Sequence, residues 1–546
     1  MKDQIMETFD FVIIGSGFGG SVSAMRLTEK GYRVLVLERG KRFRDQDFAT
    51  TNWKFWKYLW SPALRSFGIF QISNLQGMLI FHGCGVGGGS LGYANVLMEP
   101  PDVMFETPDW KDLAHWRALL RPQYDTARRM LGVTHTPRLF HSDEVLRSIA
   151  EDMDKADSFQ ATEVGVFFGE SGEEGKEHPD PYFGGEGPAR RSCNFCGGCM
   201  VGCRENAKNT LVKNYLYFAE KWGGQVWAEV QVRDIRPLPQ GQSDGARYEV
   251  VYRSSTAWLF KPERRVRSRN VVVSAGVLGT LKLLLRCRDV TGSLPLLSDT
   301  LGHKVRTNSE TLLGSMARNY EVDYSKGVAI GSALQADEVT TIEPVRYPSG
   351  SGLIRLLAAP LIKAGGRPFS RLLRILGKML RHPIDFFIIF FLYPNWALRT
   401  TIILVMQTVD NYMHVRHGRS IWTFFRRGLI SIRDEEHPIP GGIDIGYQVT
   451  RAFAEKSNGI PGATVTEGLF GMPSTAHILG GCPMGRNADE GVVDLNCQAF
   501  NYRGLYVVDG SIMPANPGIN PSLTITALAE YAMSRIPQRA KKNGEA

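Results

Sequence analysis

The fold of this chain is decided at Phe9-Asp10-Phe11-Val12-Ile13-Ile14-Gly15-Ser16-Gly17-Phe18-Gly19-Gly20. The first six residues are mostly apolar, which is typical of a buried strand, and the glycine-rich turn leads directly into a helical pattern. Gly15 permits the tight turn, Gly17 lets backbone N–H groups approach a pyrophosphate, and Gly20 lets the helix pack closely on the strand. The positive end of that helix then faces the phosphates. The stretch therefore predicts a dinucleotide site.

A second strand follows over residues 33–37 and ends at Glu38. Glu38 lies 18 residues after Gly20, close to the spacing of about 20 at which an acidic side chain accepts hydrogen bonds from an adenosine ribose. Such an acid favours FAD or NAD over NADP. A glycine-rich turn alone also occurs in other doubly wound domains, so the prediction depends on strand, helix, second strand and acid together. The choice between flavin and nicotinamide stays open at this point.

Size and charge limit the classes of protein to which the chain can belong. At 546 residues it exceeds the size at which a single core stops growing, so two domains or one large discontinuous domain are expected. The net charge is +9, but no block of Lys and Arg is long enough for a nucleic-acid arm, and we expect no nucleic-acid partner. The first apolar run is already the nucleotide-binding strand, so we expect no signal peptide, a cytoplasmic location and reduced cysteines.

A second glycine-rich stretch, Gly83-Cys84-Gly85-Val86-Gly87-Gly88-Gly89-Ser90, lies shortly before Asn95. It predicts backbone lying close against something flat or charged, and a flavin ring with its pyrophosphate meets that requirement. Residues 170–191, rich in Gly, Glu and Pro, predict a long loop. Residues 271–276 predict a buried strand followed by a leucine-rich helix, which indicates that the chain returns to the dinucleotide domain.

The segment 353–413 is both basic and apolar. Ser370, after Pro368, is expected to cap a helix with basic side chains on one face and apolar side chains on the other. The basic face suits an anionic bilayer surface, and the apolar run 386–393 is too short to span a membrane. We expect either peripheral contact at the inner face of the membrane or a substrate door; a buried strand beside a solvated helix is the alternative. The basic residues are Arg371, Arg374, Lys378 and Arg381, and the apolar ones are Leu372, Leu373, Leu376, Met379 and Leu380.

Motifs near the end of the chain resemble the glucose-methanol-choline (GMC) oxidoreductases. Two further motifs resemble the actinobacterial cholesterol oxidase branch of that family, and the resemblance spans nearly the whole chain. The GMC motifs are Thr475-Ala476-His477-Ile478-Leu479-Gly480-Gly481, Gly504-Leu505-Tyr506-Val507-Val508-Asp509-Gly510-Ser511 and Gly518-Ile519-Asn520-Pro521-Ser522-Leu523-Thr524-Ile525. The branch motifs are Val305-Arg306-Thr307-Asn308-Ser309-Glu310 and Ile342-Glu343-Pro344-Val345-Arg346-Tyr347.

The resemblance implies an α/β protein with a discontinuous Rossmann-like FAD-binding domain and an α+β substrate domain with an antiparallel sheet. We expect residues 1–100, 205–315 and 470–546 in the FAD-binding domain. Residues 101–204 and 316–469 would form the substrate domain. By motif, the ADP half of FAD would be held by Gly15, Gly17, Gly20 and Glu38, the flavin by Gly87, Gly88, Ser90 and Asn95, the adenine by the backbone of Val230, and the ribityl phosphate region by Asp509 and Gly510.

The same resemblance places His477 and Asn520 opposite the reactive nitrogen of the flavin. Oxidising an alcohol removes a hydride from carbon and a proton from oxygen, and a neutral imidazole can accept that proton near neutral pH. A neutral amide can position the alcohol without competing for the proton. In cholesterol oxidases a carboxylate also moves a proton from C4 to C6, and Glu343 occupies a corresponding position. A buried glutamate with a raised pKa suits that task, but an ordinary pairing of Glu343 with Arg346 is the alternative.

The expected function is FAD-dependent oxidation of a sterol 3β-hydroxyl to the 3-ketone, with or without isomerisation of the Δ5 to the Δ4 ketone. Oxygen or an electron carrier would accept the electrons. Two alternatives stay open. One is an FAD and iron–sulfur dehydrogenase of another apolar or long-chain alcohol, and the other is a non-catalytic, membrane-associated flavoprotein.

Four of the eight cysteines lie at Cys193, Cys196, Cys199 and Cys203, with the spacing that begins a ferredoxin-type iron–sulfur run. The proline that usually follows is replaced by Arg204. Close thiolates could bind an iron–sulfur cluster or zinc, and the alternative is a set of reduced thiols in a glycine-rich loop. The sequence therefore predicts a metal site here, which would decide between oxidase and dehydrogenase.

Overall fold

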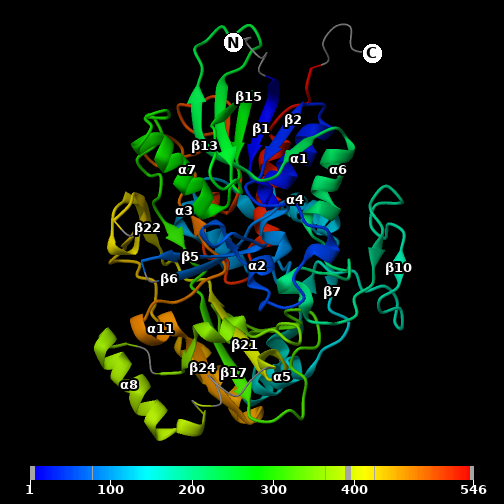
Figure 1. The fold of residues 1–546 in the computed structure, drawn as a ribbon, viewed down its shortest axis with the longest axis vertical. Helices are drawn as coiled ribbons and strands as arrows, with labels where there is room; N and C mark the ends of the chain where they lie inside the picture. The colour runs from blue at the N-terminus through cyan, green and yellow to red at the C-terminus, as the bar shows by residue number, and fades with distance from the viewer. Residues whose placement is uncertain are drawn as a thin grey trace.

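The computed structural model describes residues 7–540 except 77, 363, 364, 386, 388–394 and 424. Two large sheets lie at opposite ends of the long axis of the molecule (Figure 1). The sheet that contains β1 is at the top of this view, and the sheet that contains β17 is at the bottom.

The first sheet combines strands from distant parts of the chain. β1 pairs in parallel with β2 and β15, and β15 pairs in parallel with β26, as in a Rossmann-like sheet. The predicted discontinuous, Rossmann-like arrangement is thus confirmed. In spatial order the main path is β12 (Gln225–Trp227), β2 (Val34–Leu37), β1 (Thr8–Ile14), β15 (Arg264–Val273), β14 (Tyr248–Ser254) and β13 (Val230–Pro237), with β26 (Leu505–Val507) also on β15.

Helices cover this sheet because their apolar residues belong to one buried core. α1 (Phe18–Glu29) follows β1 directly, as predicted, and packs against α12 (Ser522–Ser534). α7 (Val277–Asp289) follows β15, also as predicted. α4 (Trp116–Leu131), expected in the substrate domain, instead packs on α12, and its buried side chains join the core of the first sheet. Long-range packing, which local patterns do not encode, decides this placement.

The second sheet is antiparallel at every neighbouring pair, as expected for the substrate domain. α5 (His141–Asp152) and α10 (Asp444–Lys456) pack on it around a second apolar core. β17 belongs here, although the expected boundary placed most of it in the FAD-binding domain. In order the strands are β20 (Ala358–Pro360), β24 (Gly459–Thr464), β17 (Thr311–Ala317), β21 (Thr400–Gln407), β19 (Thr340–Val345), β18 (Ser332–Gln335) and β8 (Phe159–Ala161).

Smaller elements lie between the two sheets. The hairpin of β5 (Phe70–Leu75) and β6 (Met78–Gly83) crosses the middle of the molecule in Figure 1. A four-stranded sheet beside it contains β25 (Leu479–Gly480), which begins two residues after His477. The predicted loop 170–191 is largely irregular, but it contains a short hairpin of two-residue strands, Glu177–His178 and Arg190–Arg191.

The predicted basic amphipathic helix is α8 (Pro368–Arg381), but two of its details are wrong. Arg367 occupies the N-cap position, and the Ser370 hydroxyl lies inside the first turn, where it donates to the Arg367 carbonyl at 2.8 Å. The basic residues do not form a free outer face. Arg371 is 1% exposed and donates to the carbonyls of Glu467, Gly468 and Gly365. It therefore supplies hydrogen-bond partners to backbone groups near the buried end of its side chain.

Apolar residues of α8 meet solvent, as the basic residues Arg374 and Arg381 also do. Except for Phe387, the apolar run 386–393 lies outside the described residues. Within the described part of the chain, no helix combines the length and the apolar character that crossing a bilayer requires.

Candidate active site

A cavity of about 510 Å³ lies between the two sheets. One wall is the N-terminus of α1, including Gly17, and the strand end at Asp509. The opposite wall is the second sheet, where Ile402 and Leu404 contribute apolar side chains. His477 and Asn520 also line this cavity, so the structure brings the predicted catalytic pair to the predicted dinucleotide site.

The N-terminus of α1 fits the pyrophosphate of FAD. Gly17 is its N-cap residue, and no side chain caps the helix, so its first N–H groups are available to a ligand. A Cβ on Gly17 would meet no atom within 4 Å, which means that this residue faces open space. A Cβ on Gly88 would lie 2.5 Å from the Gly17 Cα, so the two glycine-rich turns contact each other. Together they form a cradle of bare backbone.

Gly15 and Gly20 let α1, β1 and β15 pack closely, and they do not line the cavity. A Cβ on Gly20 would lie 2.1 Å from the Gly15 oxygen, and a Cβ on Gly15 would lie 2.1 Å from the Ser274 oxygen. Any side chain at these positions would therefore push α1 and β15 away from β1. Their contribution to FAD binding is to let the turn close.

Glu38 and Val230 lie side by side at the end of β2. The N–H of Val230 donates to the Glu38 carbonyl at 2.8 Å. The Glu38 carboxylate is buried and accepts from the N–H of Ser16 at 3.1 Å, from its hydroxyl at 2.7 Å and from the N–H of Gly40 at 2.7 Å. The residues predicted for the ribose and the adenine are thus adjacent, and their roles stay predictions.

The second glycine-rich turn positions Ser90 and Asn95. The Ser90 hydroxyl donates to the Gly87 carbonyl at 2.7 Å and accepts from the N–H of Leu211 at 3.0 Å, so it fixes the turn. Asn95 is fully buried with a left-handed backbone (φ 74°). Neither its amide nitrogen nor its amide oxygen has a hydrogen-bond partner among the described residues. Asn95 does not line the main cavity, and its amide faces the Cys199 sulfur, so its predicted contact with the flavin stays a prediction.

Asp509 and Gly510 line the same cavity at the end of the first sheet. The Asp509 carboxylate accepts from the Ser511 N–H at 2.9 Å, from its hydroxyl at 2.6 Å and from the Thr280 hydroxyl at 2.6 Å. Burial raises the pKa of this carboxyl, although these hydrogen bonds oppose the shift. Because the Asp509 carboxylate accepts these three hydrogen bonds, it fixes the backbone of the turn. A fixed turn at this place fits the predicted ribityl phosphate region.

His477 is held by Glu310, an acid for which the sequence alone predicts no role. The buried Glu310 carboxylate lies 2.7 Å from His477 Nδ1 and also accepts from Thr475 and Ala476, at 3.1 Å each. A carboxylate only accepts, so Nδ1 carries the proton, and a neutral His477 keeps its lone pair on Nε2. The only sequence signal for Glu310 was its place at the end of the motif 305–310.

Asn520 connects His477 to Glu343. With its amide nitrogen turned toward the carboxylate, Asn520 donates to the two Glu343 oxygens at 2.9 and 3.1 Å. The other amide atom lies 3.5 Å from His477 Nε2, beyond the usual range of a hydrogen bond, so this nitrogen stays open to a substrate. The three predicted catalytic residues therefore form one contiguous group.

Glu343 is fully buried in β19, and burial raises its pKa to about 8; the hydrogen bond from Asn520 lowers it and the nearby Glu310 charge raises it. The alternative pairing of Glu343 with Arg346 is wrong. Arg346 extends to the other side of the strand and donates to Asp143 at 2.7 Å, as a fully buried ion pair. Successive strand positions alternate between faces, which explains why Arg346, three residues later, cannot reach Glu343.

The four clustered cysteines line a separate small cavity and form no disulfide. Within the described part of the chain, no group of three or more His, Cys, Asp and Glu side chains is placed to hold a metal ion. The arrangement of side chains therefore gives no support to a zinc site. It does not test the iron–sulfur prediction.

Comparisons with known proteins agree with the site. A sequence model described as GMC oxidoreductase matches residues 455–529, and one described as an NAD(P)-binding Rossmann-like domain matches residues 13–44. A cholesterol oxidase of Acinetobacter baumannii is 46% identical over 537 residues, which cover 97% of this chain and 95% of that protein. A cholesterol oxidase of Mycobacterium tuberculosis is 44% identical over 547 residues, which cover 98% and 92%.

The pyridoxine 4-oxidase from Mesorbium loti has a similar fold. Its crystal structure superposes with a TM-score of 0.58 at 16% identity and covers 96% of this chain and 99% of that one. Two relatives are 44–46% identical to this chain over nearly its full length. A glycine-rich cradle that fits a dinucleotide lies at the same cavity as His477. The chain belongs to the GMC oxidoreductase family and is an FAD-dependent alcohol oxidoreductase.

Proposed function

We propose that the chain oxidises the 3β-hydroxyl of a cholesterol-like sterol to the 3-ketone and then isomerises the Δ5 ketone to the Δ4 ketone. The observation that carries this proposal is the contiguous group of His477, Asn520 and Glu343, whose first two members line a mostly apolar cavity of about 510 Å³. The two relatives that are cholesterol oxidases support the substrate class.

When bound, FAD supplies the acceptor for the hydride that leaves the carbinol carbon. A side chain of the protein accepts the proton of the hydroxyl group. His477 Nε2 accepts it from the hydroxyl, because Glu310 keeps the other ring nitrogen protonated and stabilises the imidazolium that forms. Asn520 borders the space beside Nε2, and its N–H groups hold the Glu343 carboxylate next to that space. Ile402 and Leu404 cover the ring system and exclude water, which keeps the hydride on its path.

Anaerobic reduction of the bound flavin by a 3β-hydroxysterol tests the proposal. We expect the visible absorption of oxidised flavin to bleach with cholesterol and with a sterol that lacks the side chain, and to persist with the 3α-epimer. The 3α-epimer is the matched control, because it has the same apolar surface with the hydroxyl out of reach of His477. Bleaching by long-chain primary alcohols at an equal or greater rate would favour the alternative substrate class. A flavin that no alcohol reduces would favour a non-catalytic flavoprotein.

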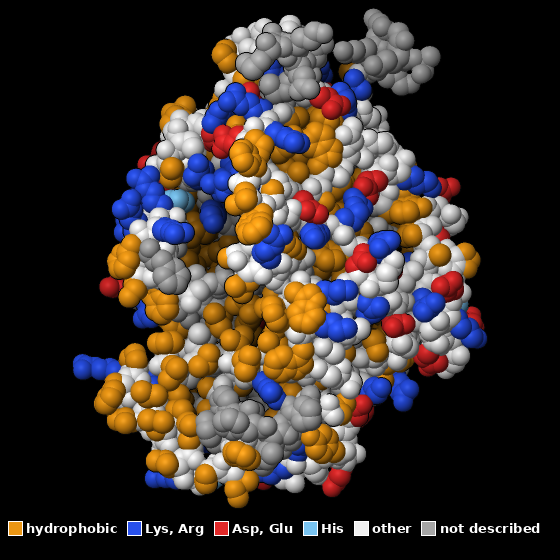
Figure 2. All heavy atoms as spheres, viewed as in Figure 1, with side chains coloured by type: hydrophobic (Ala, Val, Ile, Leu, Met, Phe, Trp, Pro, Cys, Tyr) orange, Lys and Arg blue, Asp and Glu red, His pale blue; other side chains and the backbone are white. Residues whose placement is uncertain are grey.

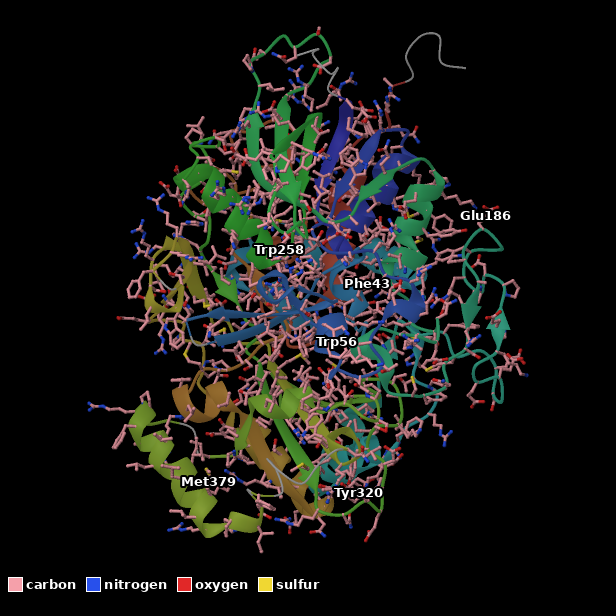
Figure 3. The ribbon with its side chains drawn as sticks, viewed as in Figure 1. Phe43, Trp56, Glu186, Trp258, Tyr320 and Met379 are labelled. Atoms are coloured by element: carbon pink, nitrogen blue, oxygen red, sulfur yellow. The ribbon has the colours of Figure 1, made fainter. Side chains whose placement is uncertain are left out.

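We also propose that α8 inserts its outer face into a phospholipid surface, from which the sterol enters. The face consists of Phe369 (71% exposed), Leu373 (53%), Leu376 (42%) and Leu380 (82%). Figure 2 shows hydrophobic side chains gathered at the lower left, where α8 lies, and Figure 3 labels Met379 on the same helix. So large an exposed apolar patch is unusual on a free surface.

The position of α8 connects this face to the active site. Ile375, on the inner side of α8, lies next to Gly468 of α11 (Val465–Phe470) and to β20. β20 lines a second apolar cavity of about 100 Å³, which shares Leu312 and Ile402 with the main cavity. A sterol leaving a bilayer at α8 would therefore meet an apolar path to His477. Because Arg371 and Lys378 donate to backbone carbonyls of the protein, we expect the contact to depend more on apolar insertion than on the exposed charges of Arg374 and Arg381.

Charged substitutions on this face test the docking. We expect the double variant L373E/L380E to bind phosphatidylcholine vesicles containing cholesterol at least about tenfold more weakly, since each buried leucine contributes about 1.5–3 kcal/mol. Turnover of detergent-dispersed sterol should not change. The control is Leu296→Glu, which alters a leucine that is 62% exposed and lies far from α8 in the chain. Vesicle binding that survives in the double variant, or that added salt abolishes in the wild type, would contradict apolar insertion.

A further inference from the structure

The cysteine run forms a site of its own beside the flavin cavity. All four side chains, those of Cys193, Cys196, Cys199 and Cys203, line a single small cavity. In ferredoxins with two clusters the fourth cysteine of such a run serves the other cluster, whereas here it faces the same space as the first three. The ligands of a four-iron cluster each bind a different iron at its outer corners. They therefore need not converge on one point, as the ligands of a single ion must.

Backbone N–H groups point at three of these sulfurs. Hydrogen bonds of this kind stabilise a thiolate and tune iron–sulfur centres. A neutral thiol is a weak acceptor and does not require them. The Phe195 N–H donates to the Cys193 sulfur at 3.4 Å, and the N–H groups of Gly198 and Ala329 lie beside the sulfurs of Cys196 and Cys199.

The loop reaches this arrangement through left-handed backbone. Phe195 has a φ of 55°, which is rare for a residue with a large side chain, and Gly197 and Gly202 have φ values of 70° and 88°. Alternation of right-handed and left-handed residues turns successive N–H groups inward and forms the concave nests that recur at iron–sulfur sites. Strain of this kind persists where a bound group or function requires it.

One buried cation, Lys208, lines the cysteine cavity, and a second, Arg190, precedes Cys193 by three residues in the chain. Lys208 is fully buried and donates to the carbonyls of Leu91, Tyr93 and Cys199 at 3.0, 2.9 and 2.8 Å. Arg190 is 2% exposed and donates to backbone carbonyls at 207 and 208. Neither forms an ion pair with Asp or Glu among the described residues. Buried charges are normally paired, and thiolates around an iron–sulfur core, whose net charge is negative, would supply the missing counter-charge.

The cysteine cavity is close to the flavin cavity. Lys208 joins the two directly, because Leu91 and Tyr93 follow the second glycine-rich turn and Tyr93 lines the main cavity. Met200, next to Cys199 in the chain, lines the main cavity as well. The otherwise unpartnered amide of Asn95 faces the Cys199 sulfur. On the other side, Cys196 is exposed, so the site also reaches the surface.

We propose that Cys193, Cys196, Cys199 and Cys203 bind a four-iron, four-sulfur cluster that passes electrons from the flavin site to a one-electron carrier protein. The inference rests on the proposed alcohol oxidation. Each alcohol loses two electrons and two protons in becoming the ketone. The electrons cross the cluster singly and reduce two molecules of oxidised carrier, and the protons leave to solvent through His477. The enzyme is then a dehydrogenase, and oxygen is a slow, competing acceptor.

Iron and acid-labile sulfide, measured on anaerobically purified holoenzyme, test the site without any substrate. We expect about four of each per flavin, and an electron paramagnetic resonance signal after reduction by dithionite. This result does not depend on the alcohol, so a failed sterol assay would leave it intact. Holoenzyme that holds flavin and reduces it with sterol but contains no iron, or zinc in its place, would overturn the proposal.

The variant Cys196→Ser tests the electron path. Cys196 is exposed, which makes it the cysteine whose change is least harmful to folding. We expect reduced iron content and an altered resonance signal, unchanged flavin reduction by sterol, and reoxidation by ferricenium at least about tenfold slower. Cys287→Ser is the matched control, because Cys287 is buried outside this cavity and donates to Asp234, as serine would. Reoxidation by ferricenium at the wild-type rate in an iron-depleted Cys196→Ser enzyme would overturn the electron-transfer role.

Discussion

Replacing His477 with asparagine should slow reduction of the bound flavin by sterol about 10²- to 10⁴-fold, the range that a positioned general base contributes. The physical reason is the fixed tautomer. Glu310 holds the proton on Nδ1, 2.7 Å away, so the Nε2 lone pair faces the alcohol. Asparagine fills part of the space but has no basic nitrogen. Anaerobic stopped-flow absorbance measures the rate constant, and flavin content measured on the same sample shows whether the cofactor site is intact.

Glu310→Gln is the companion variant for this prediction. A glutamine amide can donate to Nδ1, which would move the imidazole proton to Nε2 and remove the lone pair from the alcohol. We therefore expect Glu310→Gln to lose most of the rate that His477→Asn loses, although His477 is still present. Flavin reduction within about threefold of wild type in His477→Asn would show that the alcohol proton leaves by another route.

The nucleotide-binding part of the fold follows from local sequence. An apolar run, a glycine-rich turn, a helical pattern and a second apolar run occur in order over residues 9–38, and each is decided by neighbours in the chain. The strand at 271–273 could be predicted in the same way, because a strand that is buried on both faces is apolar throughout. These elements needed no knowledge of distant contacts.

The orientation of α8 could not be predicted in this way. Periodicity separates a basic from an apolar face, but it does not say which of them the protein covers. The answer depends on carbonyl groups at Glu467 and Gly468, about a hundred residues later, which take up the Arg371 guanidinium. The apolar face of an amphipathic helix normally packs on the protein. In α8 a basic side chain, Arg371, packs inward instead, because it donates to buried carbonyls.

In the candidate site, too, some residues could be predicted from local sequence and others could not. His477 and Asn520 lie in motifs that can be recognised, but Glu310 is 167 residues from His477 and has no local pattern that marks it. The pairing of Glu343 was likewise open, because spacing alone allowed Arg346 as a partner. The alternation of faces along β19 excluded it, and that alternation could be applied only once the strand was established.

Replacing Glu343 with glutamine should separate the two reactions of the proposed function. We expect the 3-ketone to form at nearly the wild-type rate, since His477 takes the alcohol proton. Isomerisation should fall about 10²- to 10⁴-fold, because the amide cannot accept a proton from C4 and return it at C6. The Δ5 ketone should then accumulate, which chromatography of the products measures. Glu343→Asp, which keeps a carboxylate on a shorter side chain, should retain part of the isomerisation.

The pH dependence of the wild-type enzyme gives a second, independent check. Glu343 must be ionised to accept the C4 proton, and burial raises its pKa to about 8. The isomerisation rate should therefore increase with pH up to about 8 and level off above it, whereas a glutamate with an ordinary pKa would be ionised well below neutral pH. The residual isomerisation of Glu343→Gln should not show this step. If the glutamine variant loses flavin reduction and isomerisation together, the carboxylate positions Asn520 for the oxidation instead, because the hydrogen bonds between Glu343 and Asn520 are what the two steps share.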